Sequence, residues 1–331
     1  MIATLLLVTV VLQAPAGDHG GLQQTLTDIH ALISSGQPSK ALEKLQSLPQ
    51  DDARVKYLKG VAFYHLDDPV KAIDALAPVA HQLPEGSVER KEAVQVLALS
   101  YYMAGRLKDA LPLLEETRAW ATDNVELAQV LGMAYVQTSQ NDKARVELAE
   151  TFGVPPESAA AHLLTAQMMV RLEFNDAAET EIQRAIAMSA TLPQANYLLG
   201  VIAISRAKVD DGIAFFQKEL TINPLNSMAE YRLGESYARK QHWTAAIAAL
   251  QRSLWINPYF SGPYIVLGRA YLATNDPSTA EGFLRRAVEY DPNNKSAHYL
   301  LAQTLQKLGH AEEAGKEFDV ASKLTDAQQP R

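Results

Sequence analysis

The sequence contains no cysteine, and this absence excludes several classes of site. Without a thiol the chain has no disulfide, no thiolate zinc site, no iron–sulfur cluster and no cysteine nucleophile. A cysteine that could carry a lipid after a signal peptide is missing as well. Basic residues are in deficit, because 30 Lys and Arg stand against 38 Asp and Glu and the net charge is −8. This balance argues against a nucleic-acid partner, which requires a basic face.

Long hydrophobic runs are also absent, apart from one at the N-terminus. Residues 2–12 form a nearly unbroken apolar run, which is shorter than the ~20 residues that span a bilayer, so we expect no integral membrane span. Ala14-Pro15-Ala16 follows, with small residues at the first and third places as in a signal-peptidase site. We therefore predict a signal peptide over 1–16 and a periplasmic or secreted protein. The run lacks a preceding Lys or Arg, so a cytoplasmic location, with the run packed as an apolar cap, stays open.

What the sequence does contain is a period of 34 residues. Proline follows Asn or Asp at this spacing, and Leu-Gly pairs recur at it as well. The recurring residues include Gly200, Gly234 and Gly268, and Pro224, Pro258 and Pro292. Carried along the chain, the period predicts nine blocks with no internal domain boundary. After a short linker over 17–21 the blocks are 22–52, 53–86, 91–124, 125–158, 159–192, 193–226, 227–260, 261–294 and 295–328, and a tail covers 329–331.

Each block has the pattern of two amphipathic helices joined by a polar turn. In block 227–260 the residues Lys240-Gln241-His242 form that turn. Small residues recur at one phase of each helix, such as Ala246 and Ala280 in the second helices. Two antiparallel helices approach closely only where side chains are nearly absent, so these positions predict contacts between the paired helices.

Block 261–294 has characteristic residues at fixed places: Tyr264, Leu267, Gly268, Tyr271, Ala280, Leu284, Ala287 and Pro292. With these residues the block resembles the tetratricopeptide repeat family. The resemblance covers residues 22–328 and implies an all-α fold, a right-handed superhelical solenoid of antiparallel helix pairs. Departures are local: Asp28-Ile29 replaces Leu-Gly in the first block, and residues 153–156 (Gly-Val-Pro-Pro) predict a shortened or kinked helix in the fourth.

Signatures of catalysis are missing from the chain. There is no phosphate-binding glycine loop, dinucleotide fingerprint, His-Glu-x-x-His or Gly-x-Ser-x-Gly. The eight histidines are dispersed, and no two lie at i, i+4 with a carboxylate partner, so we predict no metal site and no cofactor. Catalysis in the family that the chain resembles resides in an added domain, for which residues 22–328 leave no room. We therefore predict that the protein is not an enzyme.

In the proteins that this chain resembles, first-helix residues line an inner groove. We predict that the groove around blocks 193–294 binds a protein or peptide that carries an acidic group. The predicted groove residues are Tyr197, Tyr231, Arg232, Glu235, Arg239, Arg269 and Tyr299. Tyrosine and arginine are enriched at binding hot spots, and arginine can hold a carboxylate through two hydrogen bonds. The alternative is that the tyrosines cover neighbouring helices and the arginines pair internally.

The sequence therefore predicts a non-catalytic scaffold or adaptor for a partner of unknown identity. Two alternatives remain: an accessory factor of envelope assembly or secretion on the periplasmic side, and a chaperone-like adaptor in the cytoplasm. The last helix adds a further expectation, because Phe318, Val320 and Leu324 have no following repeat to cover them. Weak self-association through the C-terminal repeat would bury them.

Overall fold

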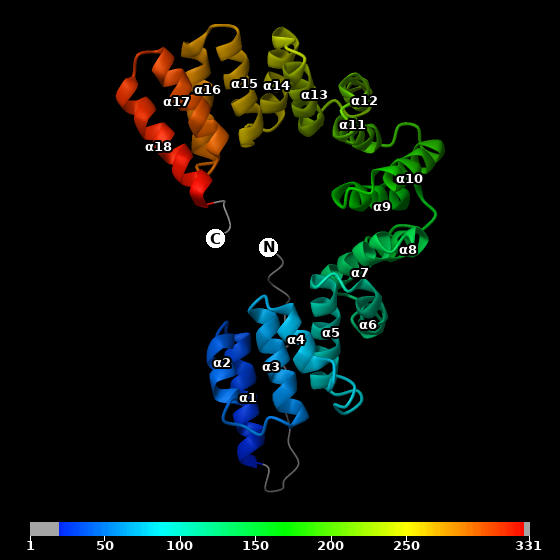
Figure 1. Cartoon of the computed structure of the whole chain (residues 1–331). Coiled ribbons are helices and arrows are strands. Elements are labelled where there is room, and N and C mark those ends of the chain that lie inside the picture. The colour runs from blue at the N-terminus through cyan, green and yellow to red at the C-terminus, as the bar shows by residue number, and fades with distance from the viewer. Residues whose placement is uncertain (1–19, 328–331) are drawn as a thin grey trace. The chain divides into compact units, whose positions relative to one another are not determined.

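The computed structural model describes residues 20–327, and this part of the chain contains eighteen α-helices and no strand (Figure 1). The predicted signal peptide over 1–16 lies outside the described residues. The contacts divide the chain into two compact units, Met1–Glu157 (unit 1) and Ser158–Arg331 (unit 2), where the 34-residue period predicted an unbroken array. None of the described helices is long and apolar enough to cross a membrane.

Unit 1 contains four antiparallel helix pairs. Its helices are α1 (Gly20–Ser34), α2 (Pro38–Leu45), α3 (Ala53–His65), α4 (Pro69–Leu76), α5 (Val88–Met103), α6 (Leu107–Trp120), α7 (Val125–Gln137) and α8 (Asn141–Thr151). The last of these has 11 residues, whereas its counterpart in the next pair, α10 (Asn175–Met188), has 14. Gly153 follows in the left-handed region (φ 64°) and two prolines come next, so the shortened helix expected here is present.

Unit 2 contains five antiparallel helix pairs. Its helices are α9 (Ala159–Arg171), α10 (Asn175–Met188), α11 (Ala195–Ser205), α12 (Val209–Ile222), α13 (Ser227–Arg239), α14 (Trp243–Ile256), α15 (Ser261–Ala273), α16 (Pro277–Tyr290), α17 (Lys295–Lys307) and α18 (Ala311–Ala327). Pro224, Pro258 and Pro292 lie exposed in the turns between consecutive pairs, where the missing N–H removes no helical hydrogen bond.

Most first helices begin at a side chain that caps the helix N-terminus. Asn124, Asn226 and Asn294 each accept a hydrogen bond from the backbone N–H three residues later, at 2.9, 3.0 and 3.1 Å. Such caps satisfy an amide that has no partner inside the helix. Helix α11 differs, because Gln194 before it has φ 76° and makes no side-chain cap. Another residue must therefore satisfy the N-terminal amides of α11.

The two helices of every pair in residues 20–327 are joined by the same backbone turn. One residue after the C-cap of the first helix adopts a left-handed conformation, with φ between 56° and 85°. These nine residues are Gly36, Asp67, Gly105, Ser139, Glu173, Ala207, Gln241, Asn275 and Gly309. The following N–H then donates to the carbonyl five residues earlier, as His242 does to Tyr237 at 2.9 Å. This arrangement satisfies a carbonyl that the helix end leaves free.

Glycines in the first helices allow the closest approach within the pairs. A Cβ atom added to Gly268 would lie 2.4 Å from Cγ of Leu284, and one added to Gly234 would lie 2.6 Å from Cγ of Leu250. At Gly200 the added atom would meet the Phe216 ring at 2.4 Å. The second helices contribute alanines to the same contacts, and Ala246 and Ala280 are fully buried. The recurring small residues are therefore packing positions.

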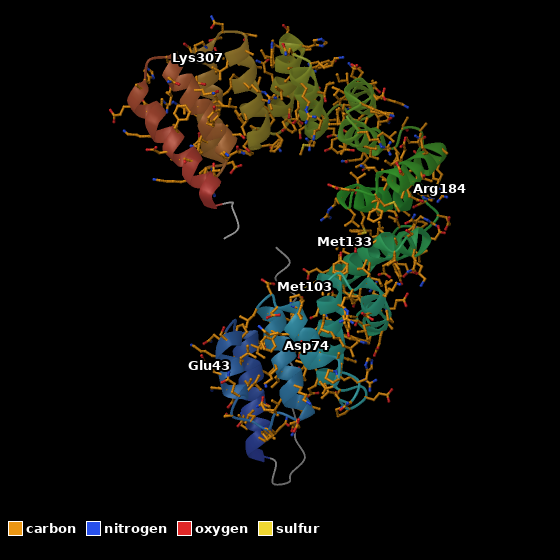
Figure 2. All side chains as sticks on the ribbon, in the orientation of Figure 1. Glu43, Asp74, Met103, Met133, Arg184 and Lys307 are labelled. Atoms are coloured by element: carbon orange, nitrogen blue, oxygen red, sulfur yellow. The ribbon has the colours of Figure 1, made fainter. Side chains whose placement is uncertain are left out.

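First helices of consecutive pairs also contact each other in unit 2, except α11 and α13, which share no comparable contact. Helix α9 contacts α11, and α15 contacts both α13 and α17, while no two second helices among the described residues share a comparable contact. The surface formed by α9, α11, α13, α15 and α17 is named here the first-helix face. Polar side chains such as Lys307 and Arg184 extend from the helices into solvent (Figure 2). The more closely spaced first helices therefore form the inner layer of unit 2.

Candidate functional site

Helix α13 supplies four of the predicted groove residues and places them on one side. Tyr231, Arg232, Glu235 and Arg239 lie within nine residues, and positions three or four apart are neighbours on a helix surface. Tyr231, Arg232 and Glu235 are half-buried, whereas Arg239 is exposed. The position of α13 between α11 and α15 in the chain brings residues of both neighbouring pairs toward this surface.

The ion pairs of the cluster converge on one carboxylate. Nη1 of Arg232 donates to Oε2 of Glu235 at 2.9 Å, and Nη2 of Arg239 donates to Oε1 of the same residue at 3.5 Å. Arg269 on α15 is exposed and forms no salt bridge with any residue in 20–327. Three guanidinium groups thus stand against one carboxylate, and the cluster keeps an excess of positive charge.

The electrostatics show that these groups lie close together. Burial raises the pKa of the Tyr231 hydroxyl, and Glu235 raises it further, while Arg232, Arg269 and Arg239 act in the opposite direction. Burial acts to lower the pKa of Arg232, but its hydrogen bond to Glu235 and the Tyr197 hydroxyl outweigh burial and raise it. The structure therefore brings together all the predicted groove residues of α11, α13 and α15.

The tyrosine rings of the cluster also pack against their neighbours. Tyr231 meets Phe260 edge-on, with ring centroids 5.0 Å apart, and Arg232 lies over the Tyr231 ring at 5.5 Å. Gly262 makes room for this packing, since an added Cβ would lie 3.1 Å from Cζ of Tyr231. Tyr197 packs on Phe216 with centroids 6.0 Å apart. These contacts hold the rings in place. A ligand that binds here would therefore lose little side-chain entropy at the tyrosines.

Tyr299 is not part of this cluster. It lies on α17, is 48% exposed, and packs only on Phe318 of α18 among the described aromatic rings, at 5.7 Å. No hydrogen bond or ion pair within residues 20–327 connects it to α13 or α15. A ligand would have to extend along the first-helix face to touch both places.

A buried carboxylate beneath the cluster was not anticipated from the sequence. Glu219 on α12 is 0% exposed and accepts hydrogen bonds from N–H of Gln194 at 2.7 Å and N–H of Tyr197 at 3.3 Å. The amide of Asn226 donates to it at 3.3 Å. Glu219 thus caps the N-terminus of α11, where a negative charge is favourable. The sequence did contain one signal for its burial: Glu219 stands at a repeat position where the next two blocks have the small residues Ser253 and Ala287.

Asn196 is a second unexpected buried group. Its side chain is 1% exposed, and neither Oδ1 nor Nδ2 has a hydrogen-bond partner in the described structure. It stands where the family pattern places a large residue, and this departure could have singled it out. An unsatisfied buried amide is unfavourable by about 1–3 kcal/mol, which makes the start of α11 a weak point of unit 2.

Unit 1 has its own cluster of titratable groups on its first helices. Nε2 of His30 on α1 lies 3.0 Å from Oε2 of Glu92 on α5, and the Tyr57 hydroxyl on α3 donates to the same oxygen. The other oxygen of Glu92 is buried without a partner. The hydrogen bond to Glu92 raises the pKa of His30 against the opposing effect of burial, whereas burial lowers the pKa of His65 nearby. The cluster connects the three first helices α1, α3 and α5.

The raised pKa of His30 predicts a pH-dependent contribution to stability. The contribution is present below the unfolded value of ~6.5 and is lost as pH rises through the folded value. We expect the thermal midpoint of His30→Asn to lie below that of wild type, and the gap between the two to be larger at pH 6 than at pH 8.5. Circular dichroism measures both midpoints. His65 titrates in the opposite sense but is present in both proteins. In a Glu92→Gln background burial becomes the largest effect on the pKa of His30, so the difference should no longer be larger at pH 6. A difference that is still larger at pH 6 in that background would contradict the assignment.

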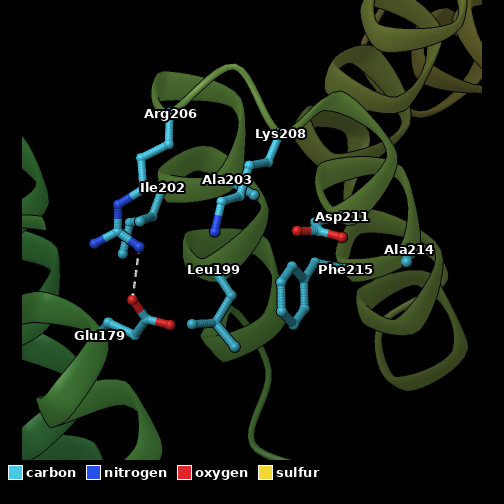
Figure 3. Close-up of a pocket in the computed structure, with 9 residues that line it drawn as sticks. All are labelled: Glu179, Leu199, Ile202, Ala203, Arg206, Lys208, Asp211, Ala214 and Phe215. Carbon is cyan, nitrogen blue, oxygen red and sulfur yellow. Dashed lines mark hydrogen bonds and ion pairs between the residues drawn. The ribbon is translucent and has the colours of Figure 1, made fainter. Parts of the chain in front are cut away.

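The described residues offer no site for a metal ion, since no group of three or more His, Asp or Glu side chains converges suitably within 20–327. The pocket shown in Figure 3 has a volume of about 350 Å³ and lies in unit 2 between α10, α11 and α12. Arg206 at its rim donates to Glu179 at 2.7 Å and also pairs with Asp176. Lys208 and Asp211 also line it, beside apolar residues such as Leu199 and Phe215. The pocket therefore combines the paired Arg206 and Glu179 with two further charged side chains and an apolar wall.

Comparison with solved structures finds helical repeat proteins. MamA from Desulfovibrio magneticus RS-1 aligns with 20% identity and a TM-score of 0.47, over 52% of this chain and 97% of that one. YrrB, described as a TPR protein with an unusual peptide-binding site, aligns with 18% identity and a TM-score of 0.47, over 56% and 95%. A tetratricopeptide repeat protein from Parabacteroides merdae aligns with 16% identity and a TM-score of 0.43, over 76% and 98%. No curated protein sequence matches the chain significantly.

Comparison with family models gives a direct assignment. One tetratricopeptide repeat model matches residues 101–168 and 271–331, a second matches 169–227, and a third matches 228–258. Together these segments make up more than half of the sequence. They agree with the antiparallel helix pairs and with the glycine and alanine contacts inside them. The chain belongs to the tetratricopeptide repeat family.

Proposed function

We propose that the protein is a non-catalytic scaffold that binds a peptide or protein segment on the first-helix face of unit 2. The segment carries an acidic group that contacts Arg239 and Arg269, with Tyr197 and Tyr231 as the apolar contact surface. The tetratricopeptide repeat fold is typical of protein–protein interaction, which supports this class of function. The identity of the partner is outside the proposal.

One observation carries the proposal: the arginine cluster is not neutralised. Glu235 already accepts from Arg232 and from Arg239, and Arg269 has no ionic partner within residues 20–327. An arginine without a partner can receive a carboxylate in a bidentate hydrogen bond without breaking an existing one. Arg232 is half-buried and paired at 2.9 Å, so we assign it to positioning Glu235 and Tyr231.

The double substitution Arg239→Gln and Arg269→Gln tests this function. It removes two exposed charges and leaves the half-buried Arg232 pair in place, so folding should be unaffected. We expect at least a tenfold loss of affinity for the partner that the wild-type protein retains, equivalent to about 1.4 kcal/mol. Affinity is measured with the purified partner by titration calorimetry at two salt concentrations.

The matched control is Arg286→Gln on the second helix α16, an arginine that is 58% exposed and pairs with Glu289. It removes a comparable charge away from the first-helix face, and its affinity for the partner should equal that of wild type. Undiminished binding by a folded double variant would rule out the arginine cluster as the binding surface.

Three further expectations are proposals of the same standing. We propose export, with cleavage after Ala16, and sequencing of the mature N-terminus distinguishes Gly17 from an intact Met1. An exported protein would be compatible with a role as an accessory factor of envelope assembly or secretion. A retained protein would be compatible with a role as a chaperone-like adaptor in the cytoplasm. We also propose weak self-association through α18, where Val320 is 36% exposed. A molar mass that does not change with concentration in light scattering would exclude it.

A further inference from the structure

The three most exposed large hydrophobic side chains of the described chain lie at the ends of α12 and α14, the second helices of two consecutive pairs of unit 2. Trp255 is 80% exposed, Tyr259 is 77% exposed and Leu225 is 65% exposed. Trp255 lies at the C-terminal end of α14, while Leu225 and Tyr259 occupy equivalent positions in the turns that follow α12 and α14. These three residues are named the corner patch. Single exposed apolar residues are common, but a group of this kind marks an interaction site.

Neighbouring residues hold the patch in its exposed position. Tyr259 packs edge-on against Tyr290, with ring centroids 6.0 Å apart, and Tyr290 in turn lies 5.4 Å from the ring of Tyr264. The hydroxyl of Tyr264 donates to the carbonyl of Pro258 at 2.9 Å, which fixes the turn just before Tyr259. The contact with Tyr290 and the fixed turn therefore hold the Tyr259 ring in its exposed position.

The exposed charges around the corner patch are predominantly basic. Lys218 on α12 is exposed and forms no salt bridge within residues 20–327, and Arg252 on α14 is 55% exposed. Helix α14 contains no acidic residue. Two nearby carboxylates are buried: Glu219 is 0% exposed, and the side chain of Glu230, which pairs with Arg252, is 7% exposed. Glu289, next to Tyr290, is 59% exposed and pairs with Arg286, so exposed basic groups outnumber exposed carboxylates at this corner.

Tryptophan, tyrosine and leucine beside exposed basic groups match the chemistry of a bilayer interface. Trp and Tyr favour the headgroup level because their rings are apolar with one polar atom, and Lys and Arg add attraction to anionic lipids. Side chains at protruding turns and helix ends suit a flat surface better than a peptide, which needs a groove. We propose that the corner patch, with Lys218 and Arg252, docks the protein peripherally on an anionic phospholipid bilayer. This contact is separate from the arginine cluster on the first-helix face.

The fluorescence of Trp255 can be used to measure contact with the bilayer. In the full-length chain, Trp120→Phe and Trp243→Phe leave Trp255 as the only tryptophan. Vesicles of equal parts phosphatidylglycerol and phosphatidylcholine should shift its emission to shorter wavelength, and acyl chains brominated near the headgroup should quench it. Vesicles of phosphatidylcholine alone should bind more weakly, because they lack the anionic headgroups.

The variant Trp255→Ser with Tyr259→Ser, in the otherwise natural chain, should partition onto the anionic vesicles at least about tenfold more weakly in a sedimentation assay. The matched control Val70→Ser with Phe152→Ser removes two exposed apolar side chains from unit 1, 61% and 48% exposed, and should partition as wild type does. Residues 1–19 are common to all variants and cancel in the comparison. The proposal would be overturned if the protein did not bind the vesicles, if the brominated lipids did not quench Trp255, or if both double variants lost the same affinity for the vesicles. A corner patch that binds only an acidic protein would overturn it as well.

Discussion

Substitution of Gly268 by valine is expected to lower the free energy of unfolding by about 3 kcal/mol. Even a Cβ at this position would lie 2.4 Å from Cγ of Leu284, and Leu284 is 0% exposed, so it has no space into which to move. The overlap involves a branch-point carbon close to the backbone of α16, which a change of rotamer displaces poorly. Helices α15 and α16 would have to separate, and the contact between this pair and α17 would weaken with them.

The same helix pair offers the control for this experiment. A Cβ added to Gly282 on α16 would meet nothing within 4 Å, and the residue is exposed. Gly282→Ala should therefore raise the free energy of unfolding by about 0.5–1 kcal/mol through helix propensity. Urea unfolding followed by circular dichroism compares the two variants with wild type. Equal midpoints for Gly268→Val and wild type would show that the pair is looser than the structure indicates.

Substitution of Glu219 by alanine is the second change for which we expect a large loss of stability, although the family pattern suggests that alanine should be tolerated there. Alanine occupies the equivalent position in α10 and α16, as Ala185 and Ala287, so Glu219→Ala brings α12 closer to the family consensus. We nevertheless expect a loss of about 3 kcal/mol, because the N–H groups of Gln194 and Tyr197 would lose their buried acceptor. The start of α11 would then have no cap.

Two variants separate this role from a simple change in size. Glu219→Gln keeps one acceptor oxygen and should lose less stability than Glu219→Ala. Ser253→Ala, at the equivalent position of α14, removes only the hydrogen bond from Oγ of Ser253 to the carbonyl of Ser227 and should lose about 1 kcal/mol. The measurement is urea unfolding, with amide hydrogen exchange at the start of α11 as a local reading. A Glu219→Ala protein as stable as wild type would exclude the capping role.

The comparison of these positions shows what sequence periodicity can and cannot predict. The 34-residue period predicted helix pairs and their small-residue contacts because close packing restricts residue type at every block, as Gly234 and Ala246 illustrate. Capping by Glu219 was not predictable, because it depends on the left-handed backbone of Gln194, and no residue type at that position signals it.

The candidate site was predictable to a similar extent. Helical spacing alone places Tyr231, Glu235 and Arg239 on one side of a helix, and the structure brings the predicted Arg269 of the neighbouring pair close to them. The packing of Tyr231 on Phe260 was not anticipated, because Phe260 precedes α15 in a turn whose course the sequence pattern does not specify. The corner patch was missed for a related reason, since a periodic pattern identifies core positions and says little about side chains that face solvent.

The left-handed residue that joins each helix pair has a consequence for how this protein could change. Six of the nine are not glycine, and four of these (Ser139, Glu173, Ala207 and Gln241) lack even the short amide or carboxylate of Asn and Asp that eases this conformation. Each of the four holds about 1 kcal/mol of backbone strain that a glycine would relieve. The array therefore carries an unused reserve of stability, which lies outside both the core and the first-helix face. Mutations that improve binding at the expense of stability could be compensated there without altering any contact surface.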